Sequence, residues 1–166
     1  MKIPICHFCA KSKILCPICQ DKLNKGEISQ ADIEVSEILI ELEEKYPQIR
    51  DIALVKAVKP MPNIILALYI SKDELRQILS RISKEIQDKK GILLKFVKRT
   101  SSIRKIMDDI ISPARVVSIN TIWLPDGSWE SNIYISPRDR KKLPLPPELI
   151  EKIVYDLINE KIHIIF

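Results

Sequence analysis

Four cysteines are the residues of this chain whose type and spacing could do chemistry, and all of them lie within the first 19 of its 166 residues. They form two Cys-x-x-Cys pairs, Cys6 with Cys9 and Cys16 with Cys19, separated by six residues. This spacing lets four thiolates surround one tetrahedral ion, and zinc suits such a site because it is redox-silent and accepts sulfur ligands. The pattern predicts one structural Zn²⁺ ion, whose binding replaces the core that about 20 residues cannot build.

Two other interpretations of the cysteines stay open, a redox pair and thiols that bind no ligand. The adjacent His7 could substitute for one ligand, but four cysteines already complete the shell. A catalytic zinc ion is disfavoured because it would need an open coordination position and a nearby general base. Lys11 and Lys13 lie between the pairs and would offset part of the charge of four thiolates.

The composition bounds the class of protein. Hydrophobic residues make up 46% and charged residues 30%, which is typical of a globular chain. The excess of 27 basic over 22 acidic residues permits a polyanionic partner without demanding one. The longest apolar run, IILALYI at 64–70, is the length of a strand and too short to cross a membrane. Because the N-terminus has no signal-peptide pattern, we expect a cytoplasmic protein, in which disulfides are disfavoured.

After residue 26 the hydrophobic pattern predicts the order helix, strand, strand, helix, strand. Ser29 and Asp32 predict the start of the first helix. Two strands, IALVKAV and IILALYI, are separated by KPMPN, whose prolines indicate a turn. Ser71 and Glu74 form a second capping-box pattern before a helix that ends at Gly91, and the strand ILLKFVK follows.

The same order then repeats. A helix after Ser101 and Ser102 ends at Pro113, and the strands ARVVSINTIWL and SWESNIYIS flank the turn PDG. A helix follows KLPLPPE, and HIIF is the last strand. The sequence therefore predicts an α+β protein with a finger at 1–26 and two α-β-β-α-β repeats at 27–99 and 100–166, each a three-stranded sheet with helices on one face.

This order resembles tandem type II KH domains, and the chain is most similar to the archaeal NusA-like transcription factors. The stretch IISPARVVSINTIWLPDGSWESNIYISPRDRKKL resembles the second KH domain of that family, and YISKDELRQILSRISKEIQDKKGILLKFVKR resembles the back half of the first. The pattern IPICHFCAKSKILCPICQDKLNKGEIS is similar to a zinc-finger variant of these proteins. The resemblance implies nucleic-acid binding and contact with RNA polymerase or another ribonucleoprotein.

The sequence departs from the family at the KH clamp. A KH domain holds single-stranded nucleic acid on a GXXG loop, whose backbone lets four nucleotides approach closely. This chain has only Gly26, Gly91 and Gly127, so neither repeat can contain that loop. The equivalent positions fall near 78–81, within a predicted helix, and near 145–148, where two prolines lack the backbone donors of a phosphate cradle.

Basic clusters are the remaining candidates for contact with single-stranded RNA, because a phosphate-tracking surface needs cations. Trp123 and Trp129 flank the PDG turn and could stack on bases. Equally, charged runs are commonly solvated faces, and a tryptophan at a strand end can cover a core or a protein interface. The candidate basic residues are Lys89, Lys90, Lys95, Lys98, Arg99, Arg104, Lys105, Arg138, Arg140, Lys141 and Lys142.

No constellation in the sequence predicts catalysis or a small-molecule substrate. There is no phosphate loop, nucleophile elbow or zinc-protease motif, and His163 lies in an apolar strand with no acidic or sulfur partner near it in sequence. We therefore expect a non-catalytic protein, and the resemblance implies a role in transcription or RNA metabolism, in which it would bind RNA through basic surfaces. The alternative is a scaffold of the transcription or translation machinery that has lost RNA binding and contacts proteins.

Overall fold

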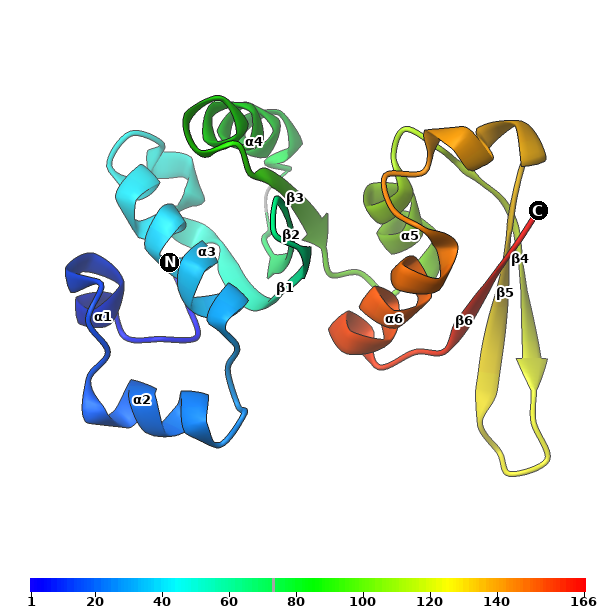
Figure 1. The fold of residues 1–166 in the computed structure, drawn as a ribbon, viewed down its shortest axis with the longest axis horizontal. Helices are drawn as coiled ribbons and strands as arrows, with labels where there is room; N and C mark the ends of the chain where they lie inside the picture. Colours follow the sequence, from blue (N-terminus) through cyan, green and yellow to red (C-terminus); the bar gives the residue numbers. More distant parts are fainter. Residues whose placement is uncertain (73) are drawn as a thin grey trace. The chain divides into compact units, whose positions relative to one another are not determined.

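The computed structural model of the chain describes residues 1–72 and 74–166, which divide into two units, Met1–Arg99 and Thr100–Phe166. The first unit contains these helices and strands in chain order: α1 (His7–Ser12), α2 (Pro17–Asn24), α3 (Gln30–Glu43), the 3₁₀ helix η1 (Pro47–Asp51), β1 (Ala53–Met61), β2 (Ile64–Ile70), α4 (Arg76–Lys90) and β3 (Leu93–Lys98). Figure 1 shows α1 and α2 at the start of the chain, before α3.

The second unit repeats the order helix, strand, strand, helix, strand. Its elements are α5 (Ile103–Ile111), β4 (Val116–Trp123), β5 (Trp129–Ile135), the 3₁₀ helix η2 (Pro137–Lys142), α6 (Pro147–Ile158) and β6 (Ile162–Ile165). The chain is a mixed α+β protein, as the sequence predicts. Among the described residues, no helix is long and apolar enough to span a membrane.

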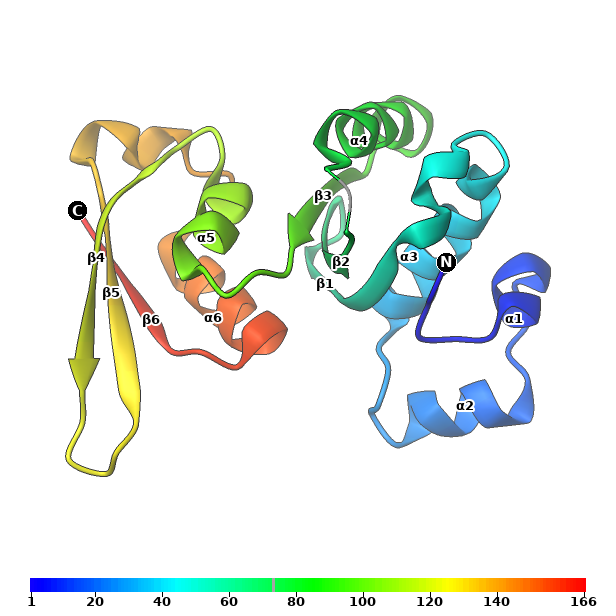
Figure 2. The same cartoon turned by 180° about the vertical axis from the view of Figure 1, so that it is seen from behind.

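Each unit has one three-stranded sheet, and the two sheets have the same topology. In the order β1-β2-β3 the first pair is antiparallel and the second parallel, and β4-β5-β6 repeats this arrangement. A parallel pair needs a crossover connection. The helix α4 makes that crossover between β2 and β3, and α6 makes it between β5 and β6. Both crossovers are visible in the view from behind (Figure 2).

The helix α3 is apolar on two faces, which explains why its sequence, QADIEVSEILIELE, is rich in aliphatic residues all round. One face, with Val35 and Leu39, packs in the core that includes sheet residues such as Ile65. The other face carries Ile33 and Ile40, which pack in a separate core with residues of the N-terminal segment. A helix that is covered on two sides is buried along most of its length.

The start of α3 is held as the sequence predicts. The Asp32 carboxylate accepts hydrogen bonds from the Ser29 backbone at 2.8 Å and the Ser29 hydroxyl at 3.0 Å, and the Asp32 backbone N–H donates to the Ser29 hydroxyl at 3.3 Å. The other carboxylate oxygen of Asp32 accepts a hydrogen bond from the Ala57 backbone N–H in β1 at 2.6 Å. The capping box therefore also joins the helix to the sheet.

Two local predictions differ from the structure. The helix α4 begins at Arg76 with Leu75 at its N-cap and no side-chain cap, so the pattern of Ser71 and Glu74 does not open it. The strand β1 continues through Pro60 to Met61, and only residues 62–63 form the turn. Proline is tolerated there because β1 is an edge strand.

Candidate functional site

The four cysteines lie at the beginnings of two short helices. Cys6 and Cys16 are the N-cap residues of α1 and α2, so Cys9 and Cys19 fall three residues later, in the first turns. The side chain of an N-cap residue and the side chain three positions later lie close together at the N-terminus of a helix, which is the geometry of a capping box. The Cys-x-x-Cys spacing thereby directs both sulfurs of a pair to the same place.

The two pairs come together. All four Sγ atoms lie within 4.8 Å of one another, with 3.0 Å between those of Cys6 and Cys9 and 4.0 Å between those of Cys6 and Cys16. Four thiolates bound tetrahedrally at 2.3 Å would be separated by about 3.8 Å. The donor set and the spacing therefore fit one metal ion, and the sequence prediction that these cysteines form a cluster is confirmed.

Backbone amides support the cluster from within the chain. The N–H of Cys16 donates to Sγ of Cys9 at 3.1 Å, and the N–H of Cys6 donates to Sγ of Cys19 at 3.5 Å. Each bond runs from one pair to the other, so it ties the two helices together. Such donors favour a sulfur that carries negative charge.

The pKa values of the two thiols differ within each Cys-x-x-Cys pair. The side-chain hydrogen bond with Cys9 lowers the pKa of Cys6, and the backbone N–H of Cys19 lowers the pKa of Cys16 to about 7. Conversely, the hydrogen bond with Cys6 raises the pKa of Cys9 to about 12, and burial raises the pKa of Cys19. Within each pair, one thiol therefore ionises more readily than the other, and a bound metal ion would favour the thiolate form of all four.

The cysteine cluster is continuous with a small hydrophobic core. The side chains of Cys9 and Cys19 are buried, and they pack with Ile5 and with Ile33 and Ile40 of α3. Cys6 is exposed and Cys16 is half-buried, so the site opens to solvent on one side. The four-cysteine segment therefore lies on α3 as part of the first unit.

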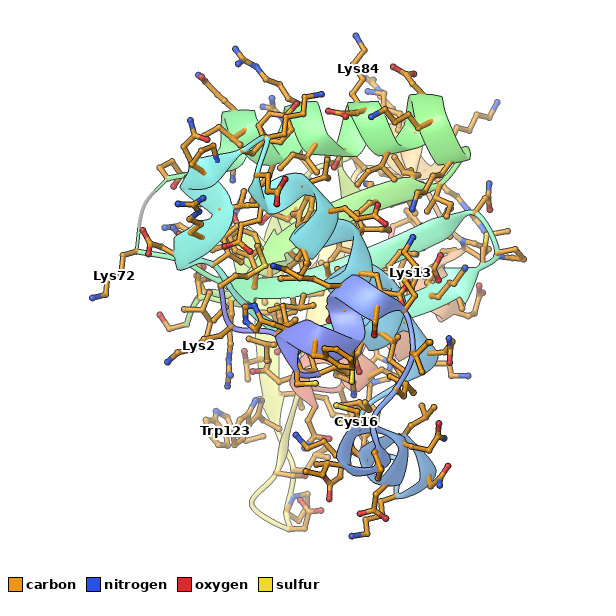
Figure 3. The ribbon with its side chains drawn as sticks, turned by 90° about the vertical axis from the view of Figure 1, so that its left-hand side faces the viewer. Lys2, Lys13, Cys16, Lys72, Lys84 and Trp123 are labelled. Carbon is orange, nitrogen blue, oxygen red and sulfur yellow. The ribbon has the colours of Figure 1, made fainter. Side chains whose placement is uncertain are left out.

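Two lysines expected near the thiolates differ in position. Lys13 forms an ion pair with Glu41 of α3, with 2.6 Å between Nζ and Oε1, and so it joins the finger to the helix. Figure 3 shows Lys13 at the end of the first finger helix and Cys16 in the next segment. Lys11 is exposed. His7 is also exposed, and its Nε2 lies 3.0 Å from the Met1 carbonyl oxygen.

The finger exposes apolar side chains that the sequence reasoning missed. Phe8 and Ile18 occupy the second middle position of the two Cys-x-x-Cys pairs, and they are 72% and 71% exposed. Ile14, between the pairs, is 72% exposed. The spacing itself was the available signal, because when both cysteines of a pair turn inward, the residues between them turn outward.

The second-unit basic residues gather at one end of their sheet. The end of β5 lies beside the start of β4, since Ile135 pairs with Val116, and η2 follows β5 directly. Arg104 reaches the same place, where its guanidinium donates to the Val116 carbonyl at 2.8 Å. We call this exposed set the basic end: Arg104, Arg115, Arg138, Arg140, Lys141 and Lys142.

An aromatic ring and an acid lie within the basic end. The guanidinium carbon of Arg140 is 5.0 Å from the centroid of the Phe166 ring, a cation–π distance. Lys142 pairs with Asp139 at 2.8 Å. Lys105, on α5, is exposed and is the remaining second-unit residue that the sequence predicted.

The first-unit basic residues are instead spread apart. Lys89 and Lys90 end α4, whereas Lys98 and Arg99 lie at the opposite end of β3, with Lys95 between them. Two of these lysines are in ion pairs, Lys89 with Glu85 at 2.7 Å and Lys98 with Glu74 at 3.7 Å.

The tryptophans and His163 lie on the second sheet. Trp123 pairs with Trp129 across the β4–β5 hairpin, with ring centroids 5.4 Å apart, and the two are 70% and 48% exposed. Both views show this hairpin running beyond α5 and α6 (Figures 1 and 2). Nε2 of His163 lies 2.8 Å from a carboxylate oxygen of Glu130 on the neighbouring strand, a partner 33 residues away in sequence.

Comparisons with known proteins show no family for this chain. No family model matches the chain, and no curated protein matches it. Among solved structures, one titled "Crystal structure of APE1850" is similar at 17% sequence identity, with a TM-score of 0.49, over 76% of this chain and 96% of that one.

Proposed function

We propose that this chain is a non-catalytic, metal-bearing factor of the NusA-like type, built on two type II KH-like repeats and acting on RNA in transcription or RNA metabolism. In this proposal it binds single-stranded RNA through basic surfaces and works in the cytoplasm with RNA polymerase or another ribonucleoprotein. The repeated helix-strand-strand-helix-strand order, with the same mixed sheet in both units, supports the KH-like assignment.

The usual KH clamp has no counterpart here. Positions 78–81, where the first GXXG loop would fall, lie inside the continuous helix α4. In the second unit Pro146 is the N-cap of α6 and Pro147 its first residue, so two backbone N–H donors are missing at the position of the loop. RNA would therefore need a different contact surface.

The basic end is the observation that carries the proposal. It places six exposed cations at one sheet end, next to the ring of Phe166. Cations that neutralise phosphates supply most of the sequence-independent affinity for nucleic acid, and an aromatic face can stack on a base. Arg140 is held over that ring, so a guanidinium and an aromatic ring would meet RNA together.

The test is fluorescence anisotropy of labelled single-stranded RNA with the metal-loaded chain over a salt series. Arg138→Glu with Lys141→Glu should weaken binding at least tenfold and reduce the salt slope by about 1.4, because two phosphate contacts are lost. The matched control, Lys84→Glu with Lys152→Glu, changes the net charge equally at exposed sites elsewhere. No binding at low salt, or equal losses in both variants, would overturn the proposal.

The ion that we propose for the finger is a single structural Zn²⁺. The four sulfur donors and the closed shell support zinc, which favours thiolates and four-coordinate geometry. Elemental analysis of the purified chain should give one zinc per molecule, and Cys9→Ser should lose it. Iron with a charge-transfer absorption band in the visible, or a disulfide in each pair, would contradict the assignment.

A second candidate function is a scaffold that contacts proteins. The observation that favours it is exposed apolar surface, on the finger at Phe8, Ile14 and Ile18 and on the hairpin at Trp123 and Trp129. Exposed apolar groups of this kind mark protein contacts more often than RNA contacts. Phe8→Ala with Ile18→Ala should leave RNA affinity unchanged under this alternative while abolishing capture of purified RNA polymerase.

A further inference from the structure

Among the described residues, no strand pairs with the outer edge of β4 in the second sheet. The Leu124 N–H donates to the Ser128 carbonyl at 2.8 Å, which makes Leu124–Ser128 a hydrogen-bonded pair of the hairpin. Hydrogen-bonded and non-hydrogen-bonded pairs alternate along an antiparallel ladder. The N–H and C=O groups of Trp123, Thr121 and Ile119 therefore point away from β5, and we call these three residues the β4 edge.

The beginning of the same strand is closed by side chains of α5. The Asp108 carboxylate accepts from the Val116 N–H at 3.1 Å, and the Arg104 guanidinium donates to the carbonyls of Val116 and Val117 at 2.8 and 3.5 Å. A β-bulge between Val116 and Ser118 also interrupts the ladder there. The strand is thus protected at its start and open from Ser118 onward.

The open part lacks the features that usually protect an edge. Natural edge strands carry charges, prolines or bulges that prevent pairing with other chains. The strand β4, VVSINTIW, contains no charged residue, no proline and no glycine, and Ile122 and Trp123 are exposed. Unpaired backbone donors and acceptors on an extended strand are satisfied best by another extended strand.

We propose that the β4 edge pairs antiparallel with the β4 edge of a second copy of this chain, to form a two-fold symmetric dimer with a continuous six-stranded sheet. Pairing centred on Thr121 places Thr121 opposite its symmetry mate and Trp123 opposite Ile119 of the other copy. Ile119 lies on the same face of the sheet as Ile133, its cross-strand partner, and Trp123 shares that face because it is four residues from Ile119 in the same strand. The arrangement is isologous, as a two-fold interface must be.

Charge supports a second copy as the partner. The second unit has nine basic and nine acidic residues, so the two second units, which carry the interface, do not repel each other through their own net charge. Antiparallel pairing brings the hairpin turn of one copy, with Asp126, beside the start of β4 in the other, with Arg115. This contact occurs twice by symmetry, and both residues are exposed.

The first experiment is sedimentation velocity of the metal-loaded full chain from about 10 μM to about 1 mM, because an interface of one strand pair is small and its affinity weak. We expect a monomer–dimer equilibrium. Thr121→Pro removes one outward N–H without breaking the bonds to β5, and it should weaken the dimer at least tenfold. Thr121→Val keeps the N–H and should leave the equilibrium unchanged.

A double-mutant cycle of Arg115 and Asp126 distinguishes a contact between two copies from an effect on folding. Arg115→Glu places a carboxylate beside Asp126 of the other copy and should weaken the dimer. Asp126→Asn retains the amide oxygen that Ser128 needs; it should weaken the dimer of the unaltered chain but strengthen that of Arg115→Glu. Within one copy the eight residues of β4 separate these side chains by about 25 Å, so this sign reversal can arise only between copies.

Circular dichroism and the unfolding midpoint of each variant show whether it is folded. A folded chain that stays monomeric over the whole concentration range overturns the proposal, and so does a dimer that survives Thr121→Pro. A reversal of sign in the double-mutant cycle together with loss of the dimer in Thr121→Pro supports it.

Discussion

Asp32 shows how much one buried side chain contributes to the first unit. It is 4% exposed, and its carboxylate accepts from the Ser29 backbone and hydroxyl and from the Ala57 N–H. The first two bonds cap α3, and the third satisfies a backbone donor of β1. A buried carboxylate is tolerated because all of these donors converge on it.

We therefore expect Asp32→Ala to destabilise the protein by about 3 kcal/mol, since it removes a helix cap and leaves the Ala57 N–H without its acceptor. Urea unfolding followed by circular dichroism measures the loss. Asp21→Ala is the control: Asp21 is exposed and pairs only with Lys25 one turn away, so a change within about 0.5 kcal/mol is expected. Equal effects of the two substitutions would show that the Asp32 network contributes little.

Glu85 is the centre of a second residue-scale network. Its carboxylate accepts from Lys45 Nζ at 2.8 Å, from the Tyr46 hydroxyl at 2.8 Å and from Lys89 at 2.7 Å. The hydrogen bond from Lys45 contributes most to lowering the pKa of Glu85 to about 2, followed by those from Lys89 and Tyr46. The network connects α4 to the segment after α3.

A lowered carboxyl pKa implies acid sensitivity. The stabilisation is complete above the unfolded-state pKa near 4.5 and is lost as pH falls toward 2, because the unfolded chain takes up the proton first. Glu85→Gln should therefore lower stability at pH 6 and have a smaller effect at pH 3, as measured by the difference in urea midpoint from the unaltered chain. Glu44→Gln, at an exposed position nearby, should show no such convergence.

At the scale of elements, α3 links the cysteine cluster to the sheet. Its Ile33 and Ile40 face the finger core, and its Val35 and Leu39 face the main core. The finger therefore shares a hydrophobic core with α3, in addition to the Lys13–Glu41 ion pair. Loss of the metal ion should expose one side of this helix.

We expect chelation of the metal to increase amide hydrogen exchange in residues 1–26 and also in α3, because the finger can no longer cover Ile33 and Ile40. Exchange mass spectrometry with and without a chelator measures this, and restoring zinc should reverse it. Peptides from α6, in the second unit, serve as the internal reference. Exchange that increases only within residues 1–26 would mean that the finger is independent of α3.

At the scale of the whole molecule, charge is divided unequally. The first unit holds 18 basic and 13 acidic residues, which is the entire net charge of +5, and the second unit is neutral. Within the first unit, residues 1–26 alone hold five lysines and one aspartate. The basic end belongs to the neutral unit, so clustering rather than net charge distinguishes it.

If RNA contacts both units, their contributions should add. Lys90→Glu with Arg99→Glu alters exposed first-unit cations, and Arg138→Glu with Lys141→Glu alters the basic end. Each pair should reduce the salt slope of RNA binding by about 1.4, and the combined variant by about twice that amount. If the two first-unit substitutions do not change the salt slope, either alone or in the combined variant, RNA contacts only the second unit.

Features that depend on neighbouring residues in sequence could be predicted from the sequence. The Cys-x-x-Cys pairs, the Ser29–Asp32 box and the turn after Trp123 each involve residues within a few positions of one another. The alternation of apolar residues also predicted the helix and strand order. Ser71 and Glu74 show the limit of such reasoning: their pattern matches a helix start, but α4 begins at Arg76, after the N-cap Leu75, whose side chain is buried in the main core.

Contacts between residues that are distant in sequence could be seen only in the tertiary structure. Examples are the ion pair of Lys13 with Glu41, the hydrogen bond between His163 and Glu130, and the position of Arg104 near η2. The partners in each case are far apart in sequence, and no periodic pattern relates their positions. The open edge at Thr121 depends on strand order, which local propensity does not encode. Residue spacing and the hydrophobic pattern thus predict the cysteine cluster and the order of helices and strands, whereas packing sets which surfaces are exposed, because exposure depends on contacts between residues that are distant in sequence.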